Sequence, residues 1–253
     1  MQLKEFVALM ERIAPPELAC EYDNPGLLIG PARGEIRSVL VALDCTPAVA
    51  REAAELGADL VLTHHPLFFQ AVKRILPDDP QTASAYALIR SGVGLYAAHT
   101  NLDAAPGGVN DALAGLLGLN GVTPFGAGIG RVGDLPEPVR LDAFVRRVDA
   151  LLGTNARFGG APERVVKRVA VGGGACGDMA ADAKLSGADA FLVGEMKHHE
   201  CIDAETLGLA AVVAGHYETE RVVLKPLIER LQRDTHDVQY TLSLADRSPL
   251  ASS

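Results

Sequence analysis

The chain has 253 residues, 48% of them hydrophobic, and a formal net charge of −9 at pH 7. This length fits one large α/β domain or two smaller ones. The acidic charge and the lack of a Lys/Arg cluster argue against a nucleic-acid partner, because binding a phosphate backbone requires a basic patch. No stretch approaches the ~18 consecutive apolar residues of a membrane span and the first residues lack a signal-peptide pattern, so we expect a cytoplasmic protein without membrane attachment.

The first predicted element is a surface helix whose apolar face carries Leu3, Phe6, Val7, Met10 and Ile13. Two later segments then read as copies of one strand–helix–strand unit. They start at Val39 and Val169, which lie 169 − 39 = 130 residues apart, and Gly57-Ala58-Asp59 matches Gly187-Ala188-Asp189. The alternative is that such triplets simply recur before strands in α/β proteins.

Local signals mark the ends of the helix in the first copy. Thr46 is the predicted N-cap, Pro47 the first helical residue, and Gly57 the left-handed residue after the helix. A third strand follows in each half and ends near His99 and His216 respectively.

Short apolar strands alternating with helices predict an α/β fold of two pseudo-repeated lobes with mostly parallel sheets. Composition divides the chain into residues 1–119 as the first lobe, 120–165 as a Gly/Pro-rich connector or small subdomain, 166–245 as the second lobe, and 246–253 as a tail.

The four cysteines, Cys20, Cys45, Cys176 and Cys201, show no C-x-x-C spacing. Reduced, half-buried thiols of a cytosolic protein are the preferred interpretation, with a disulfide or a zinc ligand as the alternative.

A glycine pattern, Gly172-x-Gly174-x-x-Gly177, follows the strand that begins at Val169. It fits the dinucleotide-binding fingerprint literally, but we find no acidic partner for a ribose where that fingerprint requires one. We therefore expect a close-packed strand-to-helix turn or an anion-binding nest, and no dinucleotide cofactor.

Six of the seven histidines fall at predicted strand ends. The predicted strand "LVLT" ends at Thr63, directly before His64 and His65. His99 closes the next strand, His198 and His199 follow the equivalent strand of the second half, and His216 follows the last. Ligands of doubly wound sheets bind beyond the carboxyl ends of the strands. The pattern therefore predicts a functional site at this edge.

Two carboxylates complete the candidate site. Asp103 follows His99 by four residues and Glu220 follows His216 by four, a spacing that places both side chains on one face of a helix. Imidazole and carboxylate ligands select zinc, iron, manganese or cobalt. The set His64, His65, Asp103, His216 and Glu220 is too large for one zinc ion and suits two ions ~3.5–4 Å apart.

Each element of this site has a structural alternative. A His-His pair also occurs at solvated strand ends, Asp103 also suits a turn or helix cap, and His216 with Glu220 also suits a surface pair on a helix. The metal interpretation is preferred because all five residues fall at one predicted edge.

At these residues the sequence resembles the NIF-three-like proteins, also called GTP cyclohydrolase 1 type 2 homologues. The resemblance covers nearly the whole chain and is carried by "YDNPGLLIG", "THHPLFF", "AHTNLDAAPGGVND", "GIGRVGDLPEP", "GEMKHHE" and "GHYETE". Tyr22 stands where the family often has tryptophan, at a position that looks structural. The extra domain that longer relatives insert between the halves is missing.

The resemblance implies two lobes facing a central metal-binding cleft, two divalent metal ions per subunit, and a toroidal homohexamer. It implies that His65 and Asp103 bind one ion, that His64 and His216 bind the other, and that Glu220 bridges them. His198 and His199 match the family's histidine pair, as residues that orient the metal ligands, as substrate contacts or as structural residues. Tyr217 and Glu218 are candidates for proton transfer.

We expect a metal-dependent hydrolase that uses a metal-activated water on a small-molecule substrate, and the family name implies GTP cyclohydrolysis of a nucleotide. The chain has no G-x-x-x-x-G-K-[ST] motif, so the cleft and the metal ions would have to recognise GTP. Phosphoesters and amides fit the site equally well. The alternative is a non-enzymatic metal-binding hexamer that acts as a chaperone, a sensor or an interaction scaffold.

Overall fold

The structure, a computed structural model, describes residues 1–250 and consists of two compact units. The first unit contains Met1–Pro106 and Leu224–Arg247, and the second contains Gly107–Val223 and residues 248–250. Each unit has its own sheet, helices and core, so the predicted α/β class with two lobes is confirmed.

The sheet of the first unit has the order β1-β4-β3-β2-β11. The pairs β4–β3, β3–β2 and β2–β11 are parallel, whereas β1 is antiparallel to β4. Because β1 runs the other way, its start lies at the edge where β2, β3 and β4 end. The bounds are β1 Gly26–Ile29, β2 Ser38–Ala42, β3 Leu60–Thr63, β4 Gly94–Ala97 and β11 Gln239–Leu242.

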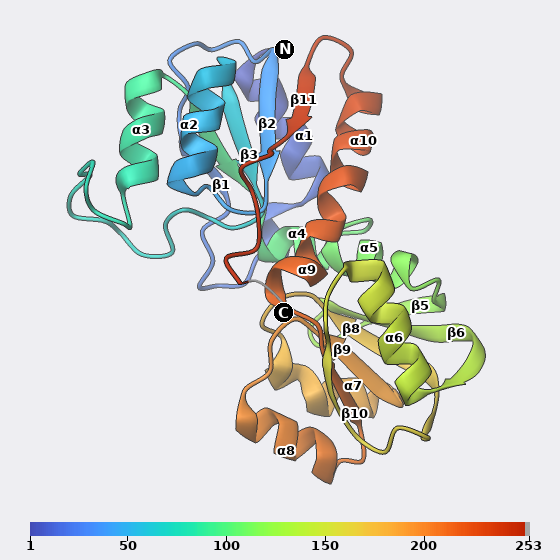
Figure 1. Cartoon of the computed structure of the whole chain (residues 1–253). Helices are drawn as coiled ribbons and strands as arrows, with labels where there is room; N and C mark the ends of the chain where they lie inside the picture. Colours follow the sequence, from blue (N-terminus) through green and yellow to red (C-terminus); the bar gives the residue numbers. More distant parts are fainter. Residues whose placement is uncertain (251–253) are drawn as a thin grey trace. The chain divides into compact units, whose positions relative to one another are not determined.

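Helices cover both faces of this sheet. In Figure 1, α2 and α3 lie on one side and α1 and α10 on the other. Thr46 caps α2 by accepting a hydrogen bond from the Val49 N–H, and Gly57 ends this helix at φ +64°, as the sequence predicted. The bounds are α1 Leu3–Ile13, η1 Pro16–Leu18, α2 Pro47–Leu56, α3 Ala83–Ser91, α4 Thr100–Ala104 and α10 Leu224–Asp234.

The sheet of the second unit has the order β5-β6-β8-β9-β10-β7. Its three central strands, β8, β9 and β10, are parallel, and β5, β6 and β7 extend it with antiparallel pairs. The bounds are β5 Asn120–Phe125, β6 Gly130–Arg140, β7 Arg157–Gly159, β8 Val165–Gly172, β9 Ala190–Val193 and β10 Ala210–Val213.

The helices of the second unit lie on both faces of its sheet, with α6 on one side and α7 and α8 on the other (Figure 1). One core cluster contains Phe144 of α6 and Leu192 of β9, and a second contains Phe191 of β9 and Ala204 of α8. The bounds are α5 Val109–Leu116, α6 Leu141–Leu152, η2 Gly177–Met179, α7 Ala180–Leu185, α8 His198–Thr206, α9 His216–Glu220 and η3 Arg221–Val223.

The two halves repeat one order of elements: β2-α2-β3-α3-β4-α4 in the first unit and β8-α7-β9-α8-β10-α9 in the second. Both runs contain three parallel strands and end in a five-residue helix directly after the third strand. The structure therefore places α4 and α9 at equivalent points of the repeated unit.

The unit boundaries differ from the division by composition. Residues 120–165 form β5, β6, α6 and β7, which belong to the second sheet because β6 pairs with both β5 and β8. The segment from Leu224 to Arg247 belongs to the first unit because β11 pairs in parallel with β2.

Part of the carboxyl-terminal segment contacts other residues of the chain. In the segment expected as a tail, Asp246 accepts a hydrogen bond of 2.7 Å from the Leu43 N–H, and Ser248 lines a pocket of the second unit. Residues 251–253 of that segment lie outside the described residues. Among residues 1–250, no helix is both long and apolar enough to cross a membrane.

Candidate metal centre

Three histidines of the first unit gather at the edge where β3 and β4 end. The strand β3 stops at Thr63, so His64 and His65 lie beyond the sheet and need not point to opposite faces. Their rings lie 5.0 Å apart between centroids, and His99 lies 5.2 Å from His64 and 5.5 Å from His65. One nitrogen from each ring falls within 4.8 Å of the other two, so these three histidines can bind a metal ion.

Each of these rings is held through its Nδ1 atom. His64 donates from Nδ1 to the carbonyl of Ala98 over 2.8 Å, since a carbonyl oxygen only accepts. His65 Nδ1 lies 2.9 Å from an oxygen of Asp44, and His99 Nδ1 lies 2.8 Å from an oxygen of Asp23. In a neutral ring held this way, the Nε2 atom carries the lone pair that binds a metal.

Asp103 of α4 contributes a carboxylate to the same edge. Its Oδ1 atom lies 3.5 Å from Nε2 of His64, and both side chains are buried. An acceptor nitrogen that faces a carboxylate oxygen favours a shared cation, either a proton or a metal ion. The first unit thus offers nitrogen and oxygen donors of the types that zinc, iron, manganese and cobalt accept.

Asp23 fixes the orientation of His99. Its other carboxylate oxygen accepts hydrogen bonds from the N–H and the Oγ1 of Thr100, at 3.0 and 2.5 Å. Burial raises the pKa of Asp23, but the hydrogen bonds from His99 and Thr100 outweigh this effect and lower it to about 2. Asp23 is therefore ionised at neutral pH and keeps a proton on Nδ1 of His99.

Replacing Asp23 by asparagine is expected to lower the free energy of unfolding by about 2 kcal/mol at pH 7. The folded pKa of Asp23, about 2, lies below the reference value of 3.8, so the carboxylate stabilises the fold above pH ~4. This contribution is lost as the pH falls through about 2. Urea unfolding of both proteins between pH 7 and pH 2 measures the difference, which should shrink towards zero. Asp203→Asn, a change at an exposed position of α8, is the control, and an equal loss in both variants would contradict the assignment.

The second unit holds His216 and Glu220 on α9, one helical turn apart. His216 Nε2 lies 3.1 Å from Oε2 of Glu220, which is buried. The Nδ1 atom of His216 lies 3.1 Å from the carboxylate of Glu195. Glu195 follows β9 and so occupies the place in the repeat that His64 and His65 occupy after β3. His216 thus has the same arrangement as His64 of the first unit: Nδ1 contacts an acceptor and Nε2 faces a carboxylate.

A glycine turn after β8 packs directly against this pair. Gly174 has φ +65°, and a Cβ atom built on it would lie 2.0 Å from Glu220 Oε1 and 3.1 Å from His216 Nε2. Its N–H donates to Thr219 Oγ1, and the Gly173 N–H donates to Asn110. The Gly172–Gly177 pattern is therefore a close-packed turn, as expected, and its function is to leave room for the α9 side chains.

The candidate catalytic residues lie in two places in the second unit. Tyr217 and Glu218 follow His216 on α9, and all three line one pocket. His198 and His199 lie instead at the exposed start of α8, where the side chain of His199 is 72% exposed. His198 lines a different pocket, between α8 and the strands β7 and β10.

Three carboxylates that orient the histidine rings were not predicted as site residues from the sequence: Asp23, Asp44 and Glu195. Each accepts at the Nδ1 atom of a histidine that is 76, 21 and 21 residues away respectively. Asp23 opens the segment that becomes the antiparallel strand β1, and its contact with His99 depends on that reversed direction. The motif that contains Asp23 was the only signal for it in the sequence.

The comparisons with known proteins agree with these features. The profile of the Duf34/NIF3 (NGG1p interacting factor 3) family matches residues 1–249. A Clostridium perfringens protein named GTP cyclohydrolase 1 type 2 homolog is 36% identical over 98% of both chains. A Schizosaccharomyces pombe protein named NIF3 homolog is 32% identical and covers 96% of this chain and 95% of its own.

Solved structures show the same fold. A crystal structure of a Staphylococcus aureus protein superposes with a TM-score of 0.94 at 26% identity and covers 100% of this chain and 99% of its own. A Bacillus cereus protein described as related to NIF3 gives a TM-score of 0.92 at 26% identity, with the same coverage. The resemblance seen in the sequence motifs is confirmed, and the chain belongs to the Duf34/NIF3 family.

Proposed function

We propose that the protein binds two divalent metal ions and uses them to hydrolyse a small-molecule substrate. The proposed ligands are His64, His65, Asp103, His216 and Glu220, with Glu220 as the bridge. The supporting observation is the geometry of the histidines: the Nδ1 atoms of His64, His65 and His216 each contact an acceptor, and Nε2 of His64 and of His216 faces a carboxylate. Metal-ligating histidines commonly have such a held second nitrogen.

When bound, two divalent ions lower the pKa of a water molecule to near neutrality and polarise the bond under attack. The protein's own residues orient the site. Asp44 and the Ala98 carbonyl fix the rings of His65 and His64, and Glu195 fixes the ring of His216. Glu218, which lines the same pocket as His216, is the proposed group for proton transfer to the leaving group, together with Tyr217.

The substrate we propose to test first is GTP, because several relatives carry the name GTP cyclohydrolase 1 type 2 homolog. Phosphoesters and amides belong in the same screen, since a metal-activated water attacks all three classes. The alternative function, a metal-binding chaperone, sensor or interaction scaffold, draws support from the name of the family, an interacting factor.

Changing Glu220 to alanine is expected to reduce bound metal from two ions per chain to one or none and to abolish hydrolysis. Glu220 is the proposed bridge, so both ions lose a ligand. The measurement is metal analysis of protein purified without a histidine tag, followed by the hydrolysis screen. Two ions retained in Glu220→Ala would contradict the bridging role. Hydrolysis that survives metal removal would contradict the hydrolase, and bound metal without turnover on any class would favour the scaffold.

The resemblance also supports a proposal for the assembly. We propose a cytoplasmic homohexamer with the shape of a toroid. Native mass spectrometry of the untagged protein tests it, with a mass of six chains as the expected result and a stable monomer or dimer as the contrary one.

A further inference from the structure

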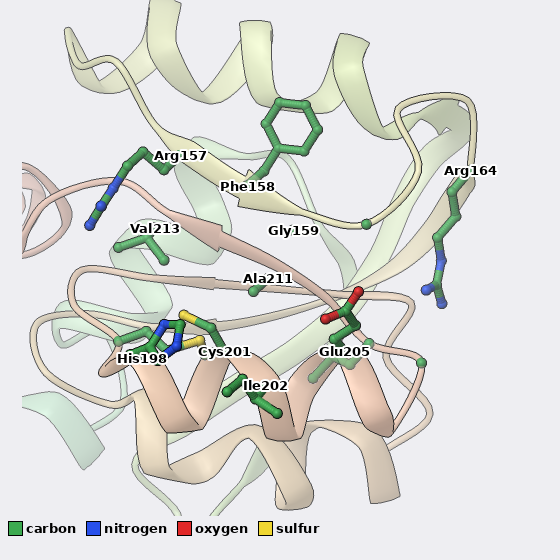
Figure 2. A pocket seen from close by; sticks show the side chains of 14 residues that line it. Arg157, Phe158, Gly159, Arg164, His198, Cys201, Ile202, Glu205, Ala211 and Val213 are labelled. Carbon is green, nitrogen blue, oxygen red and sulfur yellow. The ribbon is translucent and has the colours of Figure 1, made fainter.

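A second pocket of the second unit, which we call the α8 pocket, has no role in the proposed metal chemistry. It lies between the helix α8 and the strands β10 and β7, of which β7 is the edge strand, and has a volume of about 460 Å³ (Figure 2). Pockets of this volume hold small organic ligands.

The α8 pocket is hollow because two residues of its floor, Ala211 and Gly159, are very small. Ala211 of β10 pairs with Gly159 of β7, and Val213 pairs with Arg157. Since side chains alternate along a strand, these four residues share one face, and Phe158 points to the other face (Figure 2). A Cβ atom added at Gly159 would meet nothing within 4 Å. The pair Ala211–Gly159 therefore leaves an apolar gap under α8.

The wall and the ends of the pocket carry polar groups. The helix α8 contributes His198, Cys201, Ile202 and Glu205, whose spacing of three and four residues places them on one face. Arg157 and Arg164 lie at opposite ends of the pocket (Figure 2). The pocket has two guanidinium groups and one carboxylate, and this excess of positive charge favours an anionic ligand. Guanidinium groups bind phosphate and carboxylate through paired hydrogen bonds. Glu205 adds an acceptor for a ligand N–H or O–H.

The α8 pocket adjoins the pocket that contains the proposed metal ligand. This second pocket, the His216 pocket, has a volume of about 470 Å³ and is lined by Glu195, His216, Tyr217 and Glu218. Three residues line both pockets: Arg157, Met196 and Val213. A ligand held under α8 near Arg157 therefore lies next to the entrance of the His216 pocket.

We propose that the α8 pocket is a binding site for a small organic anion with a flat apolar body. The body lies on Ala211 and Gly159, the phosphate or carboxylate pairs with Arg157, and Glu205 accepts a hydrogen bond from the ligand. The next step rests on the proposed function: the ligand is the substrate of the hydrolase, and its reacting end extends into the His216 pocket.

The test measures binding by calorimetry with full-length protein, both metal-loaded and metal-stripped. The probes are guanosine 5′-monophosphate, 4-nitrophenyl phosphate, 4-nitrobenzoate and inorganic phosphate, which separate the flat body from the anionic group. Arg157→Ala is expected to weaken binding of the aromatic anions at least about tenfold, because a charge-assisted pair is lost. Arg146→Ala removes an exposed arginine of α6, on the other face of the sheet, and should change affinity less than twofold.

The second part of the test fills the pocket with a larger side chain. Ala211→Leu is expected to abolish binding. If that variant does not fold, Ile202→Trp fills the pocket from the half-exposed face of α8. Bound ligand should also slow the alkylation of Cys201, and peptide mass spectrometry measures the rate of this reaction. Cys45 is an internal reference, since burial raises the pKa of its thiol to about 12 and keeps it unreactive.

The outcomes separate this proposal from the proposed function. Binding of an aromatic anion that Ala211→Leu and Arg157→Ala remove supports the site, even if no probe is hydrolysed. Turnover that is unchanged in both variants overturns the site and leaves the hydrolase standing. No binding by any probe, binding of inorganic phosphate as tight as that of the aromatic anions, or unprotected Cys201 also overturns it.

Discussion

Gly174→Ala is expected to remove metal binding by α9, with a fall in metal affinity of at least about 100-fold, or ~2.7 kcal/mol. The new Cβ atom would lie 2.0 Å from Glu220 Oε1, far inside van der Waals contact, so the carboxylate must move. The φ angle of +65° adds backbone strain of about 1–2 kcal/mol for a residue other than glycine. Metal titration and thermal unfolding of the variant measure the two effects.

Gly208→Ala is the matched control. Gly208 has a nearly identical φ of +63°, but a Cβ atom there meets nothing within 4 Å. This variant should show the same backbone strain and unchanged metal binding. Equal metal affinity in Gly174→Ala and Gly208→Ala would show that Glu220 does not bind metal from its position beside the turn.

His64→Asn is the second change with a large expected effect. His64 is 1% exposed, and an asparagine amide can still donate to the Ala98 carbonyl in place of Nδ1. Only the Nε2 atom is lost, so metal affinity is expected to fall at least about 100-fold while the metal-stripped protein keeps most of its stability. Calorimetric metal titration and urea unfolding of the stripped protein make the comparison.

His236→Asn is the control for this change. His236 is exposed and does not belong to the group of histidines at the strand ends. It should leave metal binding unchanged. A metal affinity of His64→Asn equal to that of His236→Asn would mean that His64 only stabilises the strand end.

Local signals in the sequence were sufficient for the elements that position the histidines. Thr63 as the last strand residue, the N-cap at Thr46 and the left-handed Gly57 all follow from short-range chemistry, and all are confirmed. The two histidines after Thr63 were recognisable because a strand end frees consecutive side chains from the alternation of a sheet.

Long-range pairing limited the prediction elsewhere. The strand β11 joins the first sheet next to β2, although it follows the second unit in the chain. Its four residues fit an edge of either sheet, and only the packing of α10 and the available edge at β2 decide between them. The anchors Asp23, Asp44 and Glu195 were missed for the same reason, since each contact joins the ends of different strands.

The most direct test of the proposed centre is a crystal structure of the metal-loaded protein with anomalous data at the absorption edge of the bound metal. We expect two peaks per chain about 3.5–4 Å apart, each ~2.0–2.3 Å from ligand atoms. Nε2 of His64, His65 and His216 and the carboxylates of Asp103 and Glu220 should be those ligands. A single peak, or peaks bound by other residues such as His198 and Cys201, would contradict the dinuclear centre.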